Sequence, residues 1–256
     1  MRNSPFDIRC LESEGLTKLF NETASYLQRI NIEMVSCKEG EGNGEKHPAK
    51  VIGLRAWSPT ILFAESLDKG EEIEAIAHEL CHLLLICRFG LRVIDRRFPC
   101  RGSRQEMLNF CLNTHKDWAY LLGQVVNTAH HLILVDYLKE EYGIESHLHL
   151  RLLRHNFLGI VKDGNIDKES QCAKGLIAFE YDNLIKGVES VINTSLQTES
   201  FSDAYDSAKK HFGKYSFRSI PIVSCYEMDI LSLLEDLSYQ REDFIFFPRK
   251  FCARSQ

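Results

Sequence analysis

The chain has 256 residues, of which 44% are hydrophobic and 26% are charged, an ordinary composition for a globular protein. Its 31 basic and 36 acidic residues give a net charge of -5, and the basic residues are scattered, which argues against nucleic acid as a partner. The N-terminal segment lacks the apolar core of a signal peptide, no apolar run reaches the roughly 18 residues of a membrane span, and the nine cysteines show no CxxC spacing. We therefore expect a cytoplasmic protein with no membrane association and no disulfide framework.

The first 90 residues predict two helices and three strands. Residues 11–30 carry apolar side chains at helical spacing and are expected to form an amphipathic helix. A strand is expected at 32–37, followed by a polar, glycine-rich loop, and β-prone runs at 50–57 and 60–65 predict a pair of strands. An acidic first turn, from Glu71 onward, opens a second helix that we expect to end before Gly90.

The middle of the chain is expected to be mostly helical. Residues 92–104 read as a basic, irregular connection, and residues 105–142 predict helix, with a long helix ending at the sequence EEYG. Residues 145–161 are ambiguous, because they alternate like a strand but contain enough leucine for a helix.

A turn at residues 162–165 is the best domain boundary that the sequence offers. It divides the chain into a domain of residues 1–161 and a helical C-terminal extension of residues 162–256 packed on it. Within the extension, helices are expected at 168–195, 201–213 and 222–240, and the last residues, FIFFPRKFCARSQ, resemble a docking segment.

The sequence HELCH at residues 78–82 is the strongest sign of chemistry in the chain. On a helix, His82 lies about 40° around the axis from His78 and Glu79 about 100° from it, with the two histidines about 6 Å apart along the axis. Two imidazoles on successive turns can reach one metal ion, and a nearby carboxylate can take a proton from a metal-bound water and pass it to a leaving amine. The spacing therefore predicts a metal site with Glu79 as its base.

The opposite face of the same helix is apolar and is expected to lie in the core. A glutamate and two histidines in such dry surroundings need a compensating partner, and a metal ion is the simplest one. The apolar arc consists of Ile73, Ile76, Ala77, Leu80, Leu83, Leu84 and Cys87, with Leu85 and Ile86 beside the polar trio.

The motif, set in an apolar helix after two predicted strands, resembles the active-site helix of the zincin-like zinc metallopeptidases. The resemblance covers roughly residues 50–90 and implies Zn²⁺ bound by His78 and His82, Glu79 as general base, and a peptide or protein substrate. It also implies an α+β fold, mostly helical, with a small sheet beside the motif helix. The longer HExxHxxGxxH signature of the metzincins is absent, because Leu85 and Arg88 stand at its glycine and third histidine.

A catalytic zinc site uses three protein ligands, so a third must come from elsewhere in the chain. In the gluzincin branch it is a glutamate on a later helix, often in the pattern ExxxD. Glu106 has Phe110 in place of that aspartate, whereas Glu199 with Asp203 fits the pattern but falls in the predicted extension.

Better candidates stand in the long predicted helix, where His130 and His131 follow Asn127 by three and four residues. Three histidines form a sound zinc site. His130 lies nearer the apolar face, and His131 lies one turn from Asn127, so the sequence leaves both open. The alternative is a surface pair of histidines without a metal.

Further histidines carry weaker signals. His147, His149 and His155, with Arg151, are candidates for lining a substrate cleft or polarising a carbonyl, although a half-exposed helix or strand face explains them as well. Three functions follow: a zinc-dependent peptidase, a zinc-stabilised binding or regulatory module with vestigial or single-partner activity, and a metal-free interaction protein in which the motif is accidental.

Overall fold

Local sequence signals mark where the helix that carries the HELCH motif begins and ends. The computed structural model describes residues 7–27, 29–35, 48–52, 59–97, 104–160, 167–185 and 198–247, with the side chains of 104–117 and 160 left aside. Helix α2 (Lys69–Phe89) starts with a capping box: Asp68 accepts a hydrogen bond from the Glu71 N–H at 2.8 Å and donates its own N–H to the Glu71 side chain at 3.3 Å. It ends at Gly90, whose φ of 71° is the left-handed conformation of a helix C-cap.

The described residues form two compact units built from interleaved segments of the chain. Unit 1 comprises the described residues within 1–90 and 134–149, and unit 2 comprises those within 91–133 and 150–250. This division differs from the one expected at 161 and 162. The turn expected at 162–165 and the glycine-rich loop at 39–48 both fall on residues outside the described part, except Pro48.

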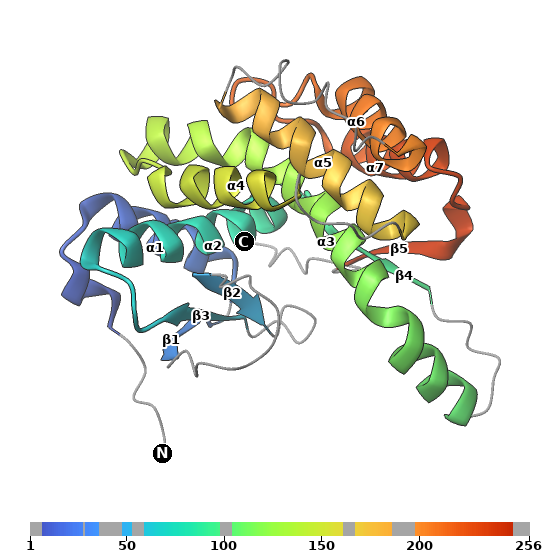
Figure 1. The fold of residues 1–256 in the computed structure, drawn as a ribbon. Helices are drawn as coiled ribbons and strands as arrows, with labels where there is room; N and C mark the ends of the chain where they lie inside the picture. Colours follow the sequence, from blue (N-terminus) through green and yellow to red (C-terminus); the bar gives the residue numbers. More distant parts are fainter. Residues whose placement is uncertain are drawn as a thin grey trace. The chain divides into compact units, whose positions relative to one another are not determined.

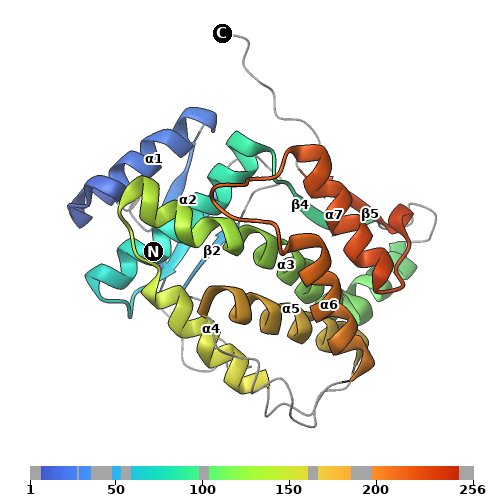
Figure 2. The same cartoon turned by 90° about the horizontal axis from the view of Figure 1, so that it is seen from above.

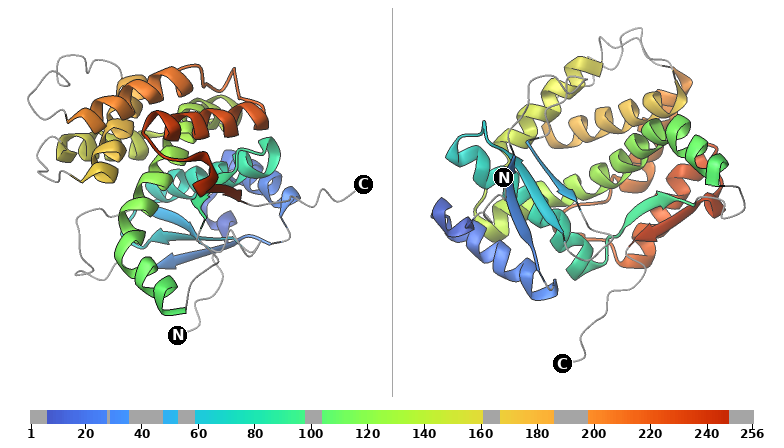
Figure 3. Two further views of the ribbon diagram at one scale, coloured as in Figure 1. Left: turned by 90° about the vertical axis from the view of Figure 1, so that its right-hand side faces the viewer. Right: turned by 90° about the horizontal axis from the view of Figure 1, so that it is seen from below.

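Unit 1 is a small sheet covered on one face by helices (Figure 1). The expected strands are confirmed as β1 (Asn31–Val35), β2 (Ala49–Ile52) and β3 (Thr60–Ala64), in the order β1-β3-β2. The central strand β3 pairs in parallel with β1 and antiparallel with β2. A short 3₁₀ helix, η1 (Ile8–Leu11), precedes helix α1 (Glu14–Tyr26), which packs with α2, and Figure 3 shows both helices behind the strands.

Helix α3 (Arg104–Tyr142) confirms the long helix expected in the middle of the chain. Its first part belongs to unit 2 and its last nine residues to unit 1. The apolar face of α3 between residues 118 and 133 is partly or fully buried. The buried members are Leu121, Leu122, Val125, Val126, Ala129, Leu132 and Ile133, and Trp118 is half-buried.

The ambiguous segment after α3 is a helix, α4 (His147–Ile160). The buried side chains Leu148, Leu153 and Phe157 hold it in place. His147, Arg151 and His155 are exposed on this helix, whereas His149 is only partly exposed.

Unit 2 continues with α5 (Lys168–Ile185), α6 (Glu199–Phe212) and α7 (Val223–Asp236), which pack side by side in chain order (Figure 2). These confirm the three helices expected after residue 167, with α7 ending earlier than expected and residues 186–195 of the first helix lying outside the described part. Gly175 allows the close approach of α5 to α6, because a Cβ at this position would lie 2.3 Å from the carbonyl oxygen of Phe201.

The prediction of an irregular connection at 92–104 is wrong for its first part. Strand β4 (Val93–Arg96) pairs antiparallel with β5 (Phe244–Phe247), which follows a 3₁₀ turn, η3 (Arg241–Asp243). The start of the expected docking tail is therefore a strand of unit 2. Trp118 packs beside this two-stranded sheet, with the Arg96 guanidinium 4.4 Å from its ring centroid. Among the described helices, none combines the length and the apolar character needed to cross a membrane.

Candidate metal centre

The motif helix α2 buries the face opposite His78, as its sequence predicts. Ile76, Ala77, Leu80, Leu83 and Leu84 are almost wholly buried, as are Leu85 and Ile86 beside the motif. His78, Glu79 and His82 are themselves only partly buried. The helix is thus held from behind by apolar packing while the three polar side chains share its other side.

His78 and His82 lie close enough to bind one ion. Their Nε2 atoms are 3.1 Å apart, and the two rings meet edge to face with centroids 4.8 Å apart. Two nitrogens bonded to a tetrahedral zinc at its usual bond length of roughly 2.05 Å lie about 3.3 Å apart. The observed separation fits that requirement, so these two residues suit the metal they are predicted to hold.

His149 joins this pair, a position that the sequence had marked only as a weak candidate. Its ring centroid is 4.8 Å from that of His78, and the donor nitrogens of the two residues lie within 4.8 Å of each other. The backbone N–H of His149, in the first turn of α4, donates to Glu74 Oε1 at 2.7 Å. Glu74 is buried and stands one turn before His78 on α2, so its carboxylate brings the start of α4 to the histidines.

The Glu79 carboxyl has the electrostatic character of a base. Desolvation raises its pKa to about 7, and a hydrogen bond from the backbone N–H of Val51 acts in the opposite direction. Val51 lies in β2, an edge strand. Pro48 accepts from Ala64 of β3, so alternation along the strand turns the N–H of Val51 away from β3 and leaves it for Glu79.

In unit 2, His131 is bound by a buried carboxylate. Its Nδ1 lies 2.7 Å from Oε1 of Glu180, and both side chains are almost fully buried. The second carboxylate oxygen accepts hydrogen bonds from Thr128 and Gln124 at 3.3 and 3.2 Å. A carboxylate at one ring nitrogen orients a histidine and makes its other nitrogen a better donor to a metal.

His130, the other predicted third ligand, is engaged within unit 2. Its Nε2 lies 3.0 Å from the carbonyl oxygen of Leu91 and 3.1 Å from the hydroxyl of Tyr226. Burial, with a smaller contribution from His131, lowers its pKa to about 3, so the ring is neutral. One ring nitrogen of His130 is thus engaged in hydrogen bonds, which favours His131 of the two.

The remaining candidates lie away from these side chains or on the surface. His147, Arg151 and His155 are exposed on α4, and Glu199 and Asp203 are exposed on α6. The side chains of Glu106 and Phe110 lie outside the described part. Cys81 is buried within α2, and burial raises its thiol pKa, so it packs as an apolar residue, as expected.

Sequence reasoning missed Glu180 and Glu74 and gave too little weight to His149. Glu180 follows an apolar run, LIAF, inside a predicted helix, and a carboxylate there needs a partner. The sequence marks Glu74 only as one of the acidic residues near the start of α2.

In comparisons with known proteins, no protein-family model, no curated protein sequence and no solved structure matches this chain.

Proposed function

We propose that the chain is a zinc-dependent peptidase in which His78, His82 and His131 hold the ion and Glu79 is the general base. The observation that carries the proposal is the 3.1 Å separation of the Nε2 atoms of His78 and His82, which suits two ligands of one zinc ion. The resemblance of the motif to zincin-like metallopeptidases points to the same chemistry.

His131 is the preferred third donor because Glu180 already orients its ring, whereas His130 is occupied by Leu91 and Tyr226. Within unit 1, His149 brings a donor nitrogen within 4.8 Å of one of His78. A set of neutral imidazole nitrogens suits zinc. Magnesium and calcium prefer oxygen ligands and would bind such a set weakly.

When bound, a zinc ion supplies a water molecule whose pKa lies near 7. Glu79 would take a proton from the water that attacks the peptide carbonyl and would pass it to the leaving amine as the C–N bond breaks. Burial raises the pKa of the Glu79 carboxyl above the usual glutamate range, which favours its taking up a proton. The Val51 N–H holds one side of the carboxylate and so limits its rotation.

Metal content and turnover test this proposal together. The purified chain is expected to contain close to one zinc ion by elemental analysis and to cleave unstructured protein or a peptide library, detected by mass spectrometry. Glu79→Gln should retain the metal and lose hydrolysis by roughly 10²–10⁴-fold, the usual contribution of a general base. Glu140→Gln, an exposed change on α3, serves as the control. A Glu79→Gln protein as active as the parent would remove the catalytic role.

A zinc-stabilised binding module is the second candidate, and the position of His149 favours it. If His149 also binds, four nitrogen donors fill a tetrahedral ion, which is the pattern of structural zinc sites. This candidate predicts one metal per chain, a lower melting temperature after chelation and no turnover on any peptide. A melting temperature that chelation leaves unchanged would instead favour the metal-free interaction protein.

A further inference from the structure

We infer that His149 is a displaceable fourth donor that closes the metal centre at rest and leaves when another ligand arrives. The inference rests on the proposed zinc site and concerns its regulation. It starts from the closeness of His149 to His78, with ring centroids 4.8 Å apart.

The His149 ring needs only a small movement to bind. Its donor nitrogen lies within 4.8 Å of that of His78, whereas two ligands of a tetrahedral zinc are about 3.3 Å apart. The difference is at most about 1.5 Å, a shift that torsional adjustment within one rotamer well supplies. A small change in its side-chain torsions would therefore let His149 share an ion with His78 without rearrangement of the helix that carries it.

The main chain of His149 is fixed, and its imidazole is not part of that attachment. Glu74 Oε1 accepts the backbone N–H of His149 at 2.7 Å, and Glu74 itself is buried on α2. The carboxylate keeps the Cα of His149 near the centre whether its ring binds or turns away. Such an anchor suits a ligand that leaves and returns.

The number of donors decides what the centre can do. With His78, His82 and His131, a tetrahedral ion keeps one position for water, as catalytic zinc sites do. With His149 as well, all four positions are filled and Glu79 has no water to deprotonate. Hydrolysis then requires that His149 leave and that a water molecule take its position, where Glu79 could deprotonate it.

The full chain loaded with Co²⁺ tests the inference through the visible spectrum of the metal, using acetohydroxamate as the incoming ligand. His149→Ala should retain Co²⁺, change the spectrum before any addition, and bind acetohydroxamate at least about tenfold more tightly than the parent. His147→Ala is the matched control, because it removes an exposed histidine from the same turn of α4. This control should behave as the parent does.

Two results would overturn the inference while leaving the proposed peptidase intact. Equal spectra and equal acetohydroxamate binding in parent and His149→Ala would show that His149 is not a donor. Loss of Co²⁺ from His149→Ala to the level of His82→Ala would make it an essential ligand. A parent that binds no Co²⁺ or Zn²⁺ would instead contradict the metal centre itself, and this inference with it.

X-ray absorption spectroscopy of the zinc-loaded parent gives a second test that needs no variant. Four imidazole nitrogens around the ion are expected, and three with one oxygen would contradict a closed resting centre. The measurement keeps the inference testable if His149→Ala does not fold, and His149→Gln provides a milder replacement.

Discussion

The Nδ1 atom of His131 lies 2.7 Å from Oε1 of Glu180, and both side chains are buried. A buried carboxylate of this kind sets the orientation of a histidine through its second nitrogen. The pair joins α3 to α5 within unit 2, and Thr128 and Gln124 complete the hydrogen bonds of the carboxylate. Its value to a metal centre can be measured by changing Glu180 and leaving every proposed ligand in place.

Glu180→Gln should weaken zinc binding by roughly 10–100-fold, because the amide keeps the size of the side chain but loses the charge that orients His131. A competition titration with a chromogenic chelator measures the change in dissociation constant. Glu199→Gln on the exposed face of α6 is the control and should match the parent. Unaltered zinc affinity in Glu180→Gln would contradict His131 as a ligand.

Alanine variants of His130 and His131, the adjacent histidines of α3, should have different effects. His131→Ala is expected to lose zinc at stoichiometric concentrations, because it removes a donor. His130→Ala should retain zinc but lower the free energy of unfolding by about 1–3 kcal/mol, since Leu91 and Tyr226 each lose a buried hydrogen-bond partner. Elemental analysis and urea unfolding measure the two effects, and exchanged outcomes would assign the ligand to His130.

The local features of this fold could be predicted from the sequence, and the long-range ones could not. Helix α2 is specified by apolar spacing, an acidic first turn and Gly90, all within about 20 residues. Strand β4 has only four residues, and its partner β5 lies about 150 residues later, so nothing near β4 signals a strand. The parallel pairing of β1 with β3 could not be predicted either, because β2 lies between them in the chain.

The residues of the candidate metal centre likewise fall into those that the local sequence predicts and those that it does not. His78, Glu79 and His82 share one helix, so helical geometry alone predicts that they lie together. His149 reaches His78 only because Glu74 holds the start of α4, and that contact spans 75 residues. Glu180 is likewise 49 residues from His131. Partners of this kind are visible in the sequence only as polar residues in apolar surroundings.

Two glycines of unit 2 should respond in opposite directions to alanine. Gly175→Ala is expected to lower the free energy of unfolding by about 1–3 kcal/mol, because its Cβ would lie 2.3 Å from the Phe201 carbonyl oxygen and force α5 and α6 apart. Gly123→Ala should raise it by up to about 1 kcal/mol, since a Cβ there meets no other atom within 4 Å and alanine favours the helix. Guanidinium unfolding of both variants provides the comparison. Equal effects of the two substitutions would contradict the close packing at Gly175.

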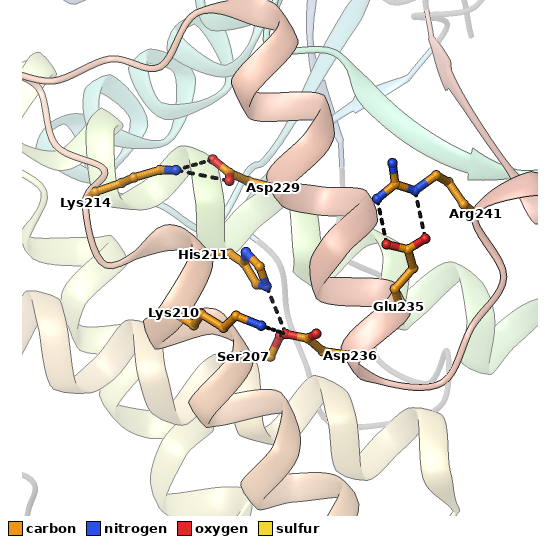
Figure 4. A network of polar contacts seen from close by, with 8 residues as sticks. All are labelled: Ser207, Lys210, His211, Lys214, Asp229, Glu235, Asp236 and Arg241. Atoms are coloured by element: carbon orange, nitrogen blue, oxygen red, sulfur yellow. Dashed lines mark hydrogen bonds and ion pairs between the residues drawn. The ribbon is translucent and has the colours of Figure 1, made fainter.

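Asp236 should contribute to stability only above acidic pH. Burial alone would raise its pKa, but hydrogen bonds from Lys210, His211 and Ser207 lower it below its ordinary value of 3.8 (Figure 4). A carboxyl with a lowered pKa in the folded state stabilises the protein above the unfolded pKa, and this stabilisation is lost as the pH falls through the folded value.

Asp236→Asn is therefore expected to be less stable than the parent by up to about 1 kcal/mol near neutral pH, a modest value because the side chain is partly exposed. The gap should close as the pH is lowered below about 4. Urea unfolding across this range measures it, with the exposed Asp206→Asn as control. A gap of constant size at every pH would show that the charge of Asp236 is not its cause.

The hydrogen bond from Val51 to Glu79 has an uncommon resistance to change, because its donor belongs to the main chain. Nineteen of the twenty genetically encoded amino acids carry that N–H, so point substitution at position 51 can remove the donor only by introducing proline. The side chain at position 51 can therefore change to suit its packing neighbours while the hydrogen bond to the Glu79 carboxylate is kept. Variation at this position would therefore say little about its part in the reaction.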